Sequence, residues 1–330
     1  MRRTIAVTTP PDMRTPPTLP RHQHGALLIL LVIALGILAA AVFVGMLSSS
    51  DIQNQRDKTT AAALAEAKAA LIGWSVSRYN DTATYSPGQL PCPEDVSKIG
   101  TSTEGTAATS CNTLATSPAI GRLPWRTLGV GDLRDGYGER LWYVISSGFR
   151  SAPINSSDSV AQLTVDGANS AVAIIFSPGS LLTGQTRTPP TAASPPNRAN
   201  YLDGTNVDGD NQFTTQGTPA NFNDRLILVS HRDLFVAVEK SIANTLLGTG
   251  ATATSGLRYV YANSSPVGYP ASPLDYGGMH FTTGTKNMFT QNKWDTLIVY
   301  PPPSNTAQFS MPTYCSASTT NGQEGTVTCP

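Results

Sequence analysis

A long apolar run begins at Ala26 and ends at Leu47 without a charged residue. As a helix that rises about 1.5 Å per residue it would span roughly 33 Å, enough for the core of a bilayer. The pattern therefore predicts a transmembrane or assembly helix over 26–47. Three roles fit it: a permanent anchor, a secretory signal cut after Ala39–Ala41, or a leader segment cut off before the run. The secretory role fits least well, since secretory apolar segments are shorter.

The polar stretch after Leu47 does not end the helical pattern. Residues 59–79 (TTAAALAEAKAALIGWSVSRY) are rich in strong helix formers, and no proline occurs before Pro87. One predicted face, at spacings of 3, 4 and 3, contains Leu64, Ala67, Leu71 and Trp74. An adjoining stripe contains Ala65, Ala69, Ile72, Val76 and Tyr79. We therefore expect one helix from about Ala26 to Tyr79, on the order of 80 Å long.

The remaining pattern predicts an antiparallel sheet with one further helix. The expected strands are 141–145, 171–176, 226–229, 256–262 and 296–300. Ser230 and Asp233 form an acidic capping box, which predicts a helix start. That helix should end at Gly248 and bury the apolar face formed by Leu234, Val238, Ile242 and Leu246. A sheet or a helix buries its apolar face only by packing on another element, so we expect the sheet and the helices to pack on each other. The predicted class is therefore α+β.

The distribution of charge predicts which end of the apolar helix faces the cytoplasm. The basic residues before Gly25 are Arg2, Arg3, Arg14 and Arg21, against the single acidic residue Asp12. Such a basic end is expected to stay in the cytoplasm. The whole chain has a formal net charge of +0 and no basic stripe, so nucleic-acid binding is not expected.

The four cysteines, Cys92, Cys111, Cys315 and Cys329, form two local pairs in sequence. No Cys-x-x-Cys occurs and no histidine lies at zinc-like spacing from them. An exported domain favours disulfides over free thiols. Three pairings are possible, and the sequence favours Cys92–Cys111 with Cys315–Cys329.

The N-terminal layout resembles the type IV pilins and the pseudopilins of type II secretion. The resemblance rests on the basic leader ending in Gly25, the apolar helix start and the long amphipathic continuation. It implies cleavage after Gly25 by a prepilin peptidase and N-methylation of Ala26. Asp135-Gly136-Tyr137-Gly138 before Leu141-Trp142-Tyr143 is similar to the turn and strand that follow the helix in pseudopilins.

The chain departs from the family pattern at two positions. Ala26 replaces the usual first phenylalanine of the mature chain, and Leu30 replaces the usual glutamate at its fifth position. The resemblance implies that this glutamate pairs with the terminal amine of a neighbouring subunit. Since an unpaired buried charge is costly, a subunit with Leu30 is expected at or near the tip of a fibre.

No catalytic motif is complete. His231-Arg232-Asp233 is similar to part of a kinase catalytic loop, but no glycine-rich loop or Asp-Phe-Gly accompanies it. A hydrolytic triad would have to use His231 or His280, because the other two histidines lie in the leader. We therefore expect a protein that is not an enzyme.

One acidic stretch offers oxygen ligands. Asp203, Asn206, Asp208 and Asp210 alternate around Gly204 and Gly209, and such a pattern is able to wrap a calcium ion. No glutamate follows at the twelfth position, and the same residue types are common in turns. Calcium is the only cofactor that the sequence indicates.

These observations predict four segments. They are a leader (1–25), a transmembrane and assembly helix (26–47), its amphipathic continuation (48–79) and a globular α+β domain (80–330) with disulfide-stapled loops. The expected function is a minor pilin or pseudopilin with other pilin subunits and a prepilin peptidase as partners. The expected location is the inner membrane, with the C-terminal domain in the periplasm or outside the cell. The alternative is a membrane-anchored periplasmic binding module that never joins a fibre.

Overall fold

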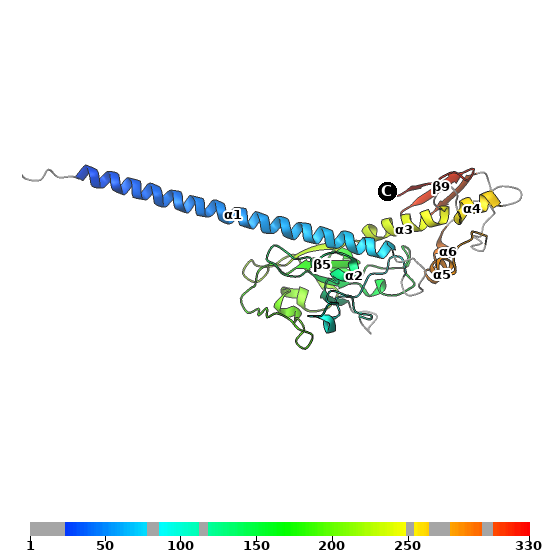
Figure 1. Cartoon of the computed structure of the whole chain (residues 1–330), viewed down its shortest axis with the longest axis horizontal. Coiled ribbons are helices and arrows are strands. Elements are labelled where there is room, and N and C mark those ends of the chain that lie inside the picture. The colour runs from blue at the N-terminus through cyan, green and yellow to red at the C-terminus, as the bar shows by residue number, and fades with distance from the viewer. Residues whose placement is uncertain (1–23, 78–85, 112–117, 249–253, 264–277, 299–305) are drawn as a thin grey trace, which may run out of the picture. The chain divides into compact units, whose positions relative to one another are not determined.

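The computed structural model describes residues 24–77, 86–111, 118–248, 254–263, 278–298 and 306–330 (Figure 1). The chain divides into two compact units, Met1–Asn54 and Gln55–Pro330. Of the predicted leader, 1–25, residues 1–23 lie outside the described residues. The structure is α+β, as the sequence predicts.

Helix α1 (His24–Val76) is continuous across the predicted boundary at 47, so the long helix is confirmed. The transmembrane part of the prediction is corrected: none of the helices in the described part of the chain has both the length and the apolar character that crossing a bilayer requires. The helix ends at Val76, whereas the sequence predicts its end at Tyr79.

A four-stranded antiparallel sheet forms the centre of the second unit (Figure 1). Its order is β1 (Ala119–Arg122), β2 (Trp142–Ile145), β5 (Ala173–Ser177) and β7 (Arg225–Val229). Every residue of β2 and β5 is buried, which explains why these strands read as continuous apolar runs rather than alternating ones. The predicted strands 141–145, 171–176 and 226–229 are confirmed within two residues at their ends.

Helices cover one face of this sheet. Tyr143, Ile145 and Ile175 point to that face and share a core cluster with the C-terminal part of α1 and with helix α3 (His231–Leu247). The predicted α1 face is confirmed, since Leu64, Ala67, Leu71 and Trp74 are all buried. The adjoining stripe is not a second buried face, because Ala65 and Ala69 are exposed.

The other face carries a second core cluster. Trp142, Val144, Ile174 and Phe176 pack there against a three-stranded sheet of order β4-β3-β6 and against Tyr201 and Leu202. The strands are β4 (Asn169–Ala171), β3 (Leu163–Val165) and β6 (Gln212–Phe213). Strand β3 pairs antiparallel with β4 and parallel with β6.

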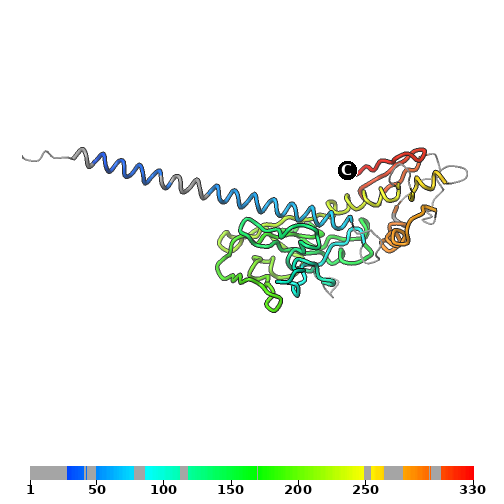
Figure 2. Tube along the Cα trace, in the orientation of Figure 1, coloured from blue at the N-terminus to red at the C-terminus, as the bar shows by residue number. Residues whose placement is uncertain are grey.

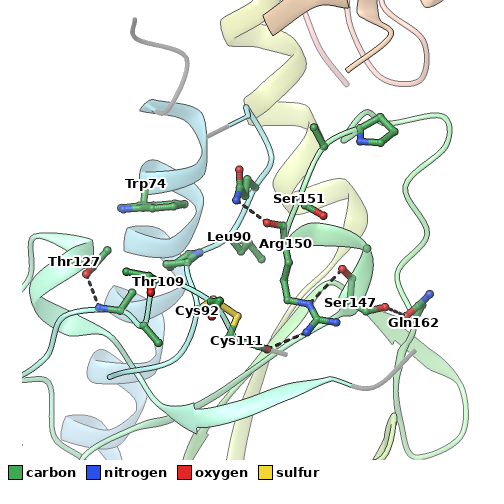
Figure 3. A pocket seen from close by; sticks show the side chains of 18 residues that line it. Trp74, Leu90, Cys92, Thr109, Cys111, Thr127, Ser147, Arg150, Ser151 and Gln162 are labelled. Atoms are coloured by element: carbon green, nitrogen blue, oxygen red, sulfur yellow. Dashed lines mark hydrogen bonds between the residues drawn. A yellow bond between two sulfur atoms is a disulfide. The ribbon is translucent and has the colours of Figure 1, made fainter. Parts of the chain in front are cut away.

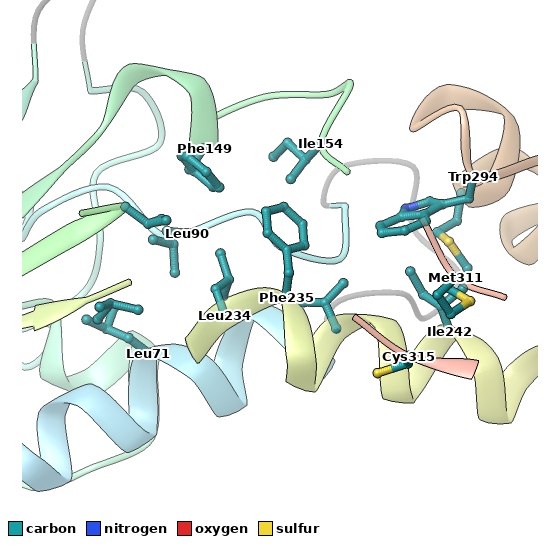
Figure 4. Packing of buried hydrophobic residues seen from close by; sticks show 14 of the residues in the cluster. Leu71, Leu90, Phe149, Ile154, Leu234, Phe235, Ile242, Trp294, Met311 and Cys315 are labelled. Carbon is teal, nitrogen blue, oxygen red and sulfur yellow. The ribbon is translucent and has the colours of Figure 1, made fainter. Parts of the chain in front are cut away.

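Helix α3 begins with the predicted capping box. Ser230 Oγ accepts from the Asp233 amide, and the Asp233 carboxylate accepts from the Ser230 amide. The helix carries its apolar face into a core that also contains the C-terminal sheet of order β10-β9-β8 (Figure 4). These strands are β8 (Thr306–Ser310), β9 (Ser316–Thr320) and β10 (Thr326–Thr328), the last described part of the trace in Figure 2.

A buried carboxylate ties α3 to the C-terminal sheet. Glu239 is fully buried, and its carboxylate accepts from the amides of Thr313 (3.1 Å), Tyr314 (2.8 Å) and Cys315 (2.7 Å) and from Ser156 Oγ. Such a set of donors compensates the desolvation of the charge. Glu239 therefore holds the hairpin before β9 against the helix.

The remaining elements are short. The 3-10 turns are η2 (Val96–Lys98), η3 (Ser147–Phe149), η4 (Arg198–Asn200) and η5 (Gly204–Val207). The helices are α2 (Trp125–Leu128), α4 (Gly256–Asn263), α5 (Thr283–Gln291) and α6 (Trp294–Leu297).

Two strand predictions are wrong. Residues 256–262 form α4, and 294–297 form α6, while 299 and 300 lie outside the described residues. Both stretches are short and apolar, and periodicity alone does not separate a strand from a helix at that length.

Both disulfides adopt the pairing that the sequence favours, Cys92–Cys111 and Cys315–Cys329. The first closes a loop before β1, and the second joins the start of β9 to the chain end after β10.

The turn at 135–138 docks directly on helix α1. The Asp135 carboxylate accepts from the amides of Tyr137, Glu139 and Gly179, which fixes the turn against the end of β5. The Gly136 amide donates to Thr60 Oγ1 at 3.0 Å. A Cβ at Gly136 would lie 2.2 Å from the backbone oxygen of Arg56, so only glycine fits at this contact.

We predict that Gly136→Ala lowers the free energy of unfolding by about 2 kcal/mol. The added Cβ would overlap backbone atoms of α1, which shift less easily than a flexible side chain. Gly131→Ala is the matched control, since its Cβ would meet no atom within 4 Å. Denaturant unfolding of the full chain measures both variants. Equal midpoints would contradict the close approach of turn and helix.

Candidate functional site

Helix α1 exposes an apolar segment, residues 28–40, which we call the apolar helix segment. Its large side chains, Leu28, Ile29, Leu30, Leu31, Val32, Ile33, Leu35, Ile37 and Leu38, are 52–66% exposed. Consecutive helical residues are separated by about 100°, so thirteen in a row cover every side of the helix. This segment is therefore apolar on every side and exposed on every side. Helices that are apolar on every side are normally buried on every side.

The predicted processing residues lie at the start of this helix. Gly25 and Ala26 follow His24 within α1, and the leader before them lies outside the described residues. Leu30 is 64% exposed. It contributes an aliphatic side chain to the segment at the position where the resemblance implies a glutamate.

The second candidate site is a cavity beside the first disulfide (Figure 3). It has a volume of ≈ 590 Å³ and is lined by Trp74, Leu90, the Cys92–Cys111 bridge, Arg150 and Gln162, among others. Arg150 Nη1 donates to the Cys111 carbonyl oxygen at 3.0 Å, which anchors the guanidinium at the disulfide. Gln89 Nε2 donates to the Arg150 carbonyl oxygen, and both residues line the cavity.

The predicted calcium ligands do not converge. Asp203 is buried, and its carboxylate accepts from Gln185 Nε2 (2.8 Å) and the Asn223 amide (2.9 Å). Asn206 Nδ2 donates to Asp224 Oδ2 and to the Thr214 carbonyl. The protein's own donors thus take up both carboxylate oxygens of Asp203, and Asn206 Oδ1 accepts from the Thr214 amide at 2.9 Å.

The other two residues of that stretch have local roles. The Asp208 carbonyl accepts from Arg198 Nη2, and Asp210 Oδ1 accepts from the Gln212 amide at 2.8 Å. In the described part of the chain, no group of three or more His, Cys, Asp or Glu side chains is arranged to hold a metal ion.

The same loop contains a carboxyl that the sequence does not single out. Asp224 lies just before β7, and its Oδ2 accepts from the Asp203 amide and from Asn206, both at 2.9 Å. The pKa of Asp224 is raised to about 7, mainly by burial and to a smaller extent by the nearby charge of Asp203, while hydrogen bonding by Asn206 and the charge of Arg187 act in the opposite direction. Asp224 therefore titrates near neutral pH.

The two histidines considered for catalysis lie in different surroundings. His231 Nδ1 is 2.8 Å from the Tyr314 hydroxyl, and burial lowers the pKa of its imidazole. His280 Nδ1 is 3.0 Å from the Thr254 carbonyl oxygen, and its ring stacks on Tyr259. The structure thus places each of them in a separate local contact.

Some of the structurally important polar residues do leave a signal in the sequence. Glu239 lies four residues after Phe235 and three before Ile242, which places a carboxylate on an apolar helix face. Such a residue is expected to be paired. Asp224 leaves no such signal, because it lies in a loop whose Asp and Asn residues are typical of turns.

No protein-family model matches the sequence, and neither the curated proteins nor the solved structures contain a match to it.

We predict that stability falls as pH rises from about 4 to about 7. In that range the folded Asp224 keeps a proton that the unfolded chain releases, so the folded state binds more protons and loses stability as they leave. The contribution is on the order of 4 kcal/mol at most. Asp224→Asn should flatten this part of the profile in thermal melts across pH, whereas the exposed control Asp210→Asn should not. An unchanged slope in Asp224→Asn would refute the assignment.

Proposed function

We propose that this chain is a structural, non-enzymatic subunit of a type IV pilin-like fibre, either a minor pilin or a pseudopilin. The observation that carries the proposal is the apolar helix segment, which exposes large aliphatic side chains on every side of one helix. A single flat partner would cover only one side of it. A bundle of equivalent helices covers all sides, and the helices of neighbouring subunits supply it.

The energetics favour such a bundle. Burying a fully exposed valine, leucine or isoleucine contributes about 1.5–3 kcal/mol, so covering the nine such side chains of the segment outweighs the entropy of ordering the subunit. No charged side chain within 28–40 opposes the burial. The continuous helix α1 joins this segment to the residues that pack on the central sheet, and the globular unit would then be displayed on the outside of the fibre.

Leu30 supports a position at the end of the fibre. A subunit without a carboxylate at this position offers no partner for the terminal amine of the next subunit. We therefore propose that it sits at or near the tip, where no further subunit follows it along the fibre axis, while the helices of the subunits below surround its apolar helix segment.

The proposal includes processing after Gly25. We expect that co-production with a prepilin peptidase gives a chain that starts at Ala26 and is one methyl group heavier than the bare sequence. Gly25→Leu should abolish this product, while Gly36→Ala, whose Cβ meets no atom within 4 Å, should be processed normally. Intact mass and N-terminal sequencing measure the result. A chain that still starts at Met1, or one that starts near Val42, would contradict the proposal.

Assembly provides an independent test. Leu35→Glu should remove the subunit from the sheared fibre fraction, because a carboxylate buried in an apolar bundle costs several kcal/mol. Leu35→Met keeps the apolar character and should be incorporated normally. Immunogold labelling of the wild-type fibres should mark fibre ends. Equal incorporation of both variants would contradict the bundle, and labelling along the shaft would contradict the tip position.

The cavity beside Cys92–Cys111 favours a second candidate, a binding module that never joins a fibre. Its volume of ≈ 590 Å³ lies within the usual range for sites that hold a small molecule. The two candidates differ at Gly25, because a binding module should tolerate Gly25→Leu with unchanged yield and location.

A further inference from the structure

The cavity beside Cys92–Cys111 contains a single charged side chain. Among the 18 described residues that line it, only Arg150 carries a charge, and none of the walls includes an Asp, Glu, Lys or His. All of these residues lie between positions 74 and 162, within the globular unit. Because a cleft with charge of one sign concentrates ligands of the opposite sign, the walls favour an anion.

Two backbone carbonyls hold the Arg150 guanidinium at the cavity wall (Figure 3). Nη1 donates to the Cys111 carbonyl oxygen at 3.0 Å, and Nε donates to the Ser147 carbonyl oxygen at 3.4 Å. Both carbonyls belong to residues that line the cavity, so the guanidinium lies among the wall residues. The two bonds fix the plane of a group whose planar fork matches the geometry of a carboxylate.

The Arg150 side chain is half-buried, so a ligand is able to reach it. Burial lowers the pKa of its guanidinium, but an arginine stays protonated throughout the physiological pH range. A cation that has lost part of its water shell interacts more strongly with an anion than a fully solvated cation does. Arg150 is therefore a stronger anion-binding group than an arginine at the open surface.

The single positive charge selects the kind of anion. A carboxylate carries one negative charge and binds a guanidinium through two parallel hydrogen bonds. A phosphate group carries about −1.5 to −2 at pH 7, so one guanidinium would leave part of its charge uncompensated. A metal cation is disfavoured, because Arg150 would repel it and the walls supply no carboxylate ligand.

The other walls indicate what the rest of the ligand contains. Ala107 and Ala108 are half-exposed and Pro153 is exposed, so they offer apolar surface to a ligand. Thr109 and Ser151 are exposed at the same cavity and supply hydroxyl groups, which are able to donate or to accept. The walls thus suit a small molecule with an apolar group beside its charged end.

We infer that the cavity beside Cys92–Cys111 binds a small monocarboxylate with an apolar group, and that Arg150 holds the carboxylate. The volume of ≈ 590 Å³ is in the usual range for small-molecule sites. A free organic acid and the C-terminal residue of a peptide both present this chemistry, and the test separates them. The inference rests on the cavity that favours the second candidate function, and it holds whether or not the chain joins a fibre.

The test is ligand-observed saturation-transfer NMR on the full chain at pH 7. The probes are N-acetyl-L-leucine, which represents a peptide terminus, and 4-methylpentanoate, which represents a free acid. Each acid is compared with its uncharged amide. We expect a dissociation constant of about 1 mM or tighter for at least one acid, and binding about tenfold weaker for its amide, which lacks the charge-assisted hydrogen bonds. The acid that binds more tightly identifies the source of the ligand.

Variants of the arginine test its role. Arg150→Gln should weaken binding of the acid about tenfold, and Arg150→Lys about threefold, because lysine keeps the charge but lacks the planar fork. Arg198→Gln is the matched control. Arg198 is also half-buried and donates to a backbone carbonyl, that of Asp208, but it does not line the cavity. The control should bind like the wild type, and melting curves show whether each variant folds.

Four results would overturn the inference. They are no signal from either acid at about 10 mM, equal binding of an acid and its amide, equal binding by the wild type and folded Arg150→Gln, and displacement of the acid by an equal concentration of inorganic phosphate. The comparison of acid and amide uses the wild type alone, so it decides the question even if Arg150→Gln does not fold. Each of these results would leave the fibre proposal standing, because that proposal is tested at Gly25 and Leu35.

Discussion

The globular unit depends on burial of both faces of the sheet β1-β2-β5-β7. Strands β2 and β5 have no solvent-facing side, so every one of their residues has to find a packing partner. On one face the partners come from α1 and α3, and on the other they come from the sheet β4-β3-β6 and from Tyr201. Segments from residue 63 to residue 317 share the first of these clusters, so the two ends of the unit fold against a common centre.

The sequence correctly predicts those elements of the globular unit whose structure depends on a long pattern or on contacts between residues close in sequence. The helix over 59–76 and the capping box at Ser230 depend on contacts a few residues apart, and both are confirmed. The predictions at 256–262 and 296–300 are wrong because short apolar stretches take their structure from what they pack against. The transmembrane prediction rests on hydropathy over 26–47 alone, and the described helix does not meet that requirement.

The candidate sites also differ in how far the sequence predicts them. The apolar helix segment is visible in the sequence, because one uninterrupted run of residues forms it. Trp74, Cys111 and Arg150 are far apart in the chain, and only tertiary contacts bring them to one cavity. Asp203, Asn206, Asp208 and Asp210 show the opposite case. They are neighbours in sequence, but backbone amides bond the side-chain oxygens of Asp203, Asn206 and Asp210 separately, and the Arg198 guanidinium bonds the Asp208 carbonyl. Spacing predicts a ligand set only when the backbone leaves the oxygens free to converge.

The amide cluster around Glu239 links the integrity of helix α3 to the completeness of the chain. Its three backbone donors come from Thr313, Tyr314 and Cys315, within the last eighteen residues. A polypeptide released before those residues would leave a charged side chain in an apolar core, with its helix unable to pack. A truncated chain without residues 313–315 would thus expose apolar core surface and aggregate more readily than the intact unit.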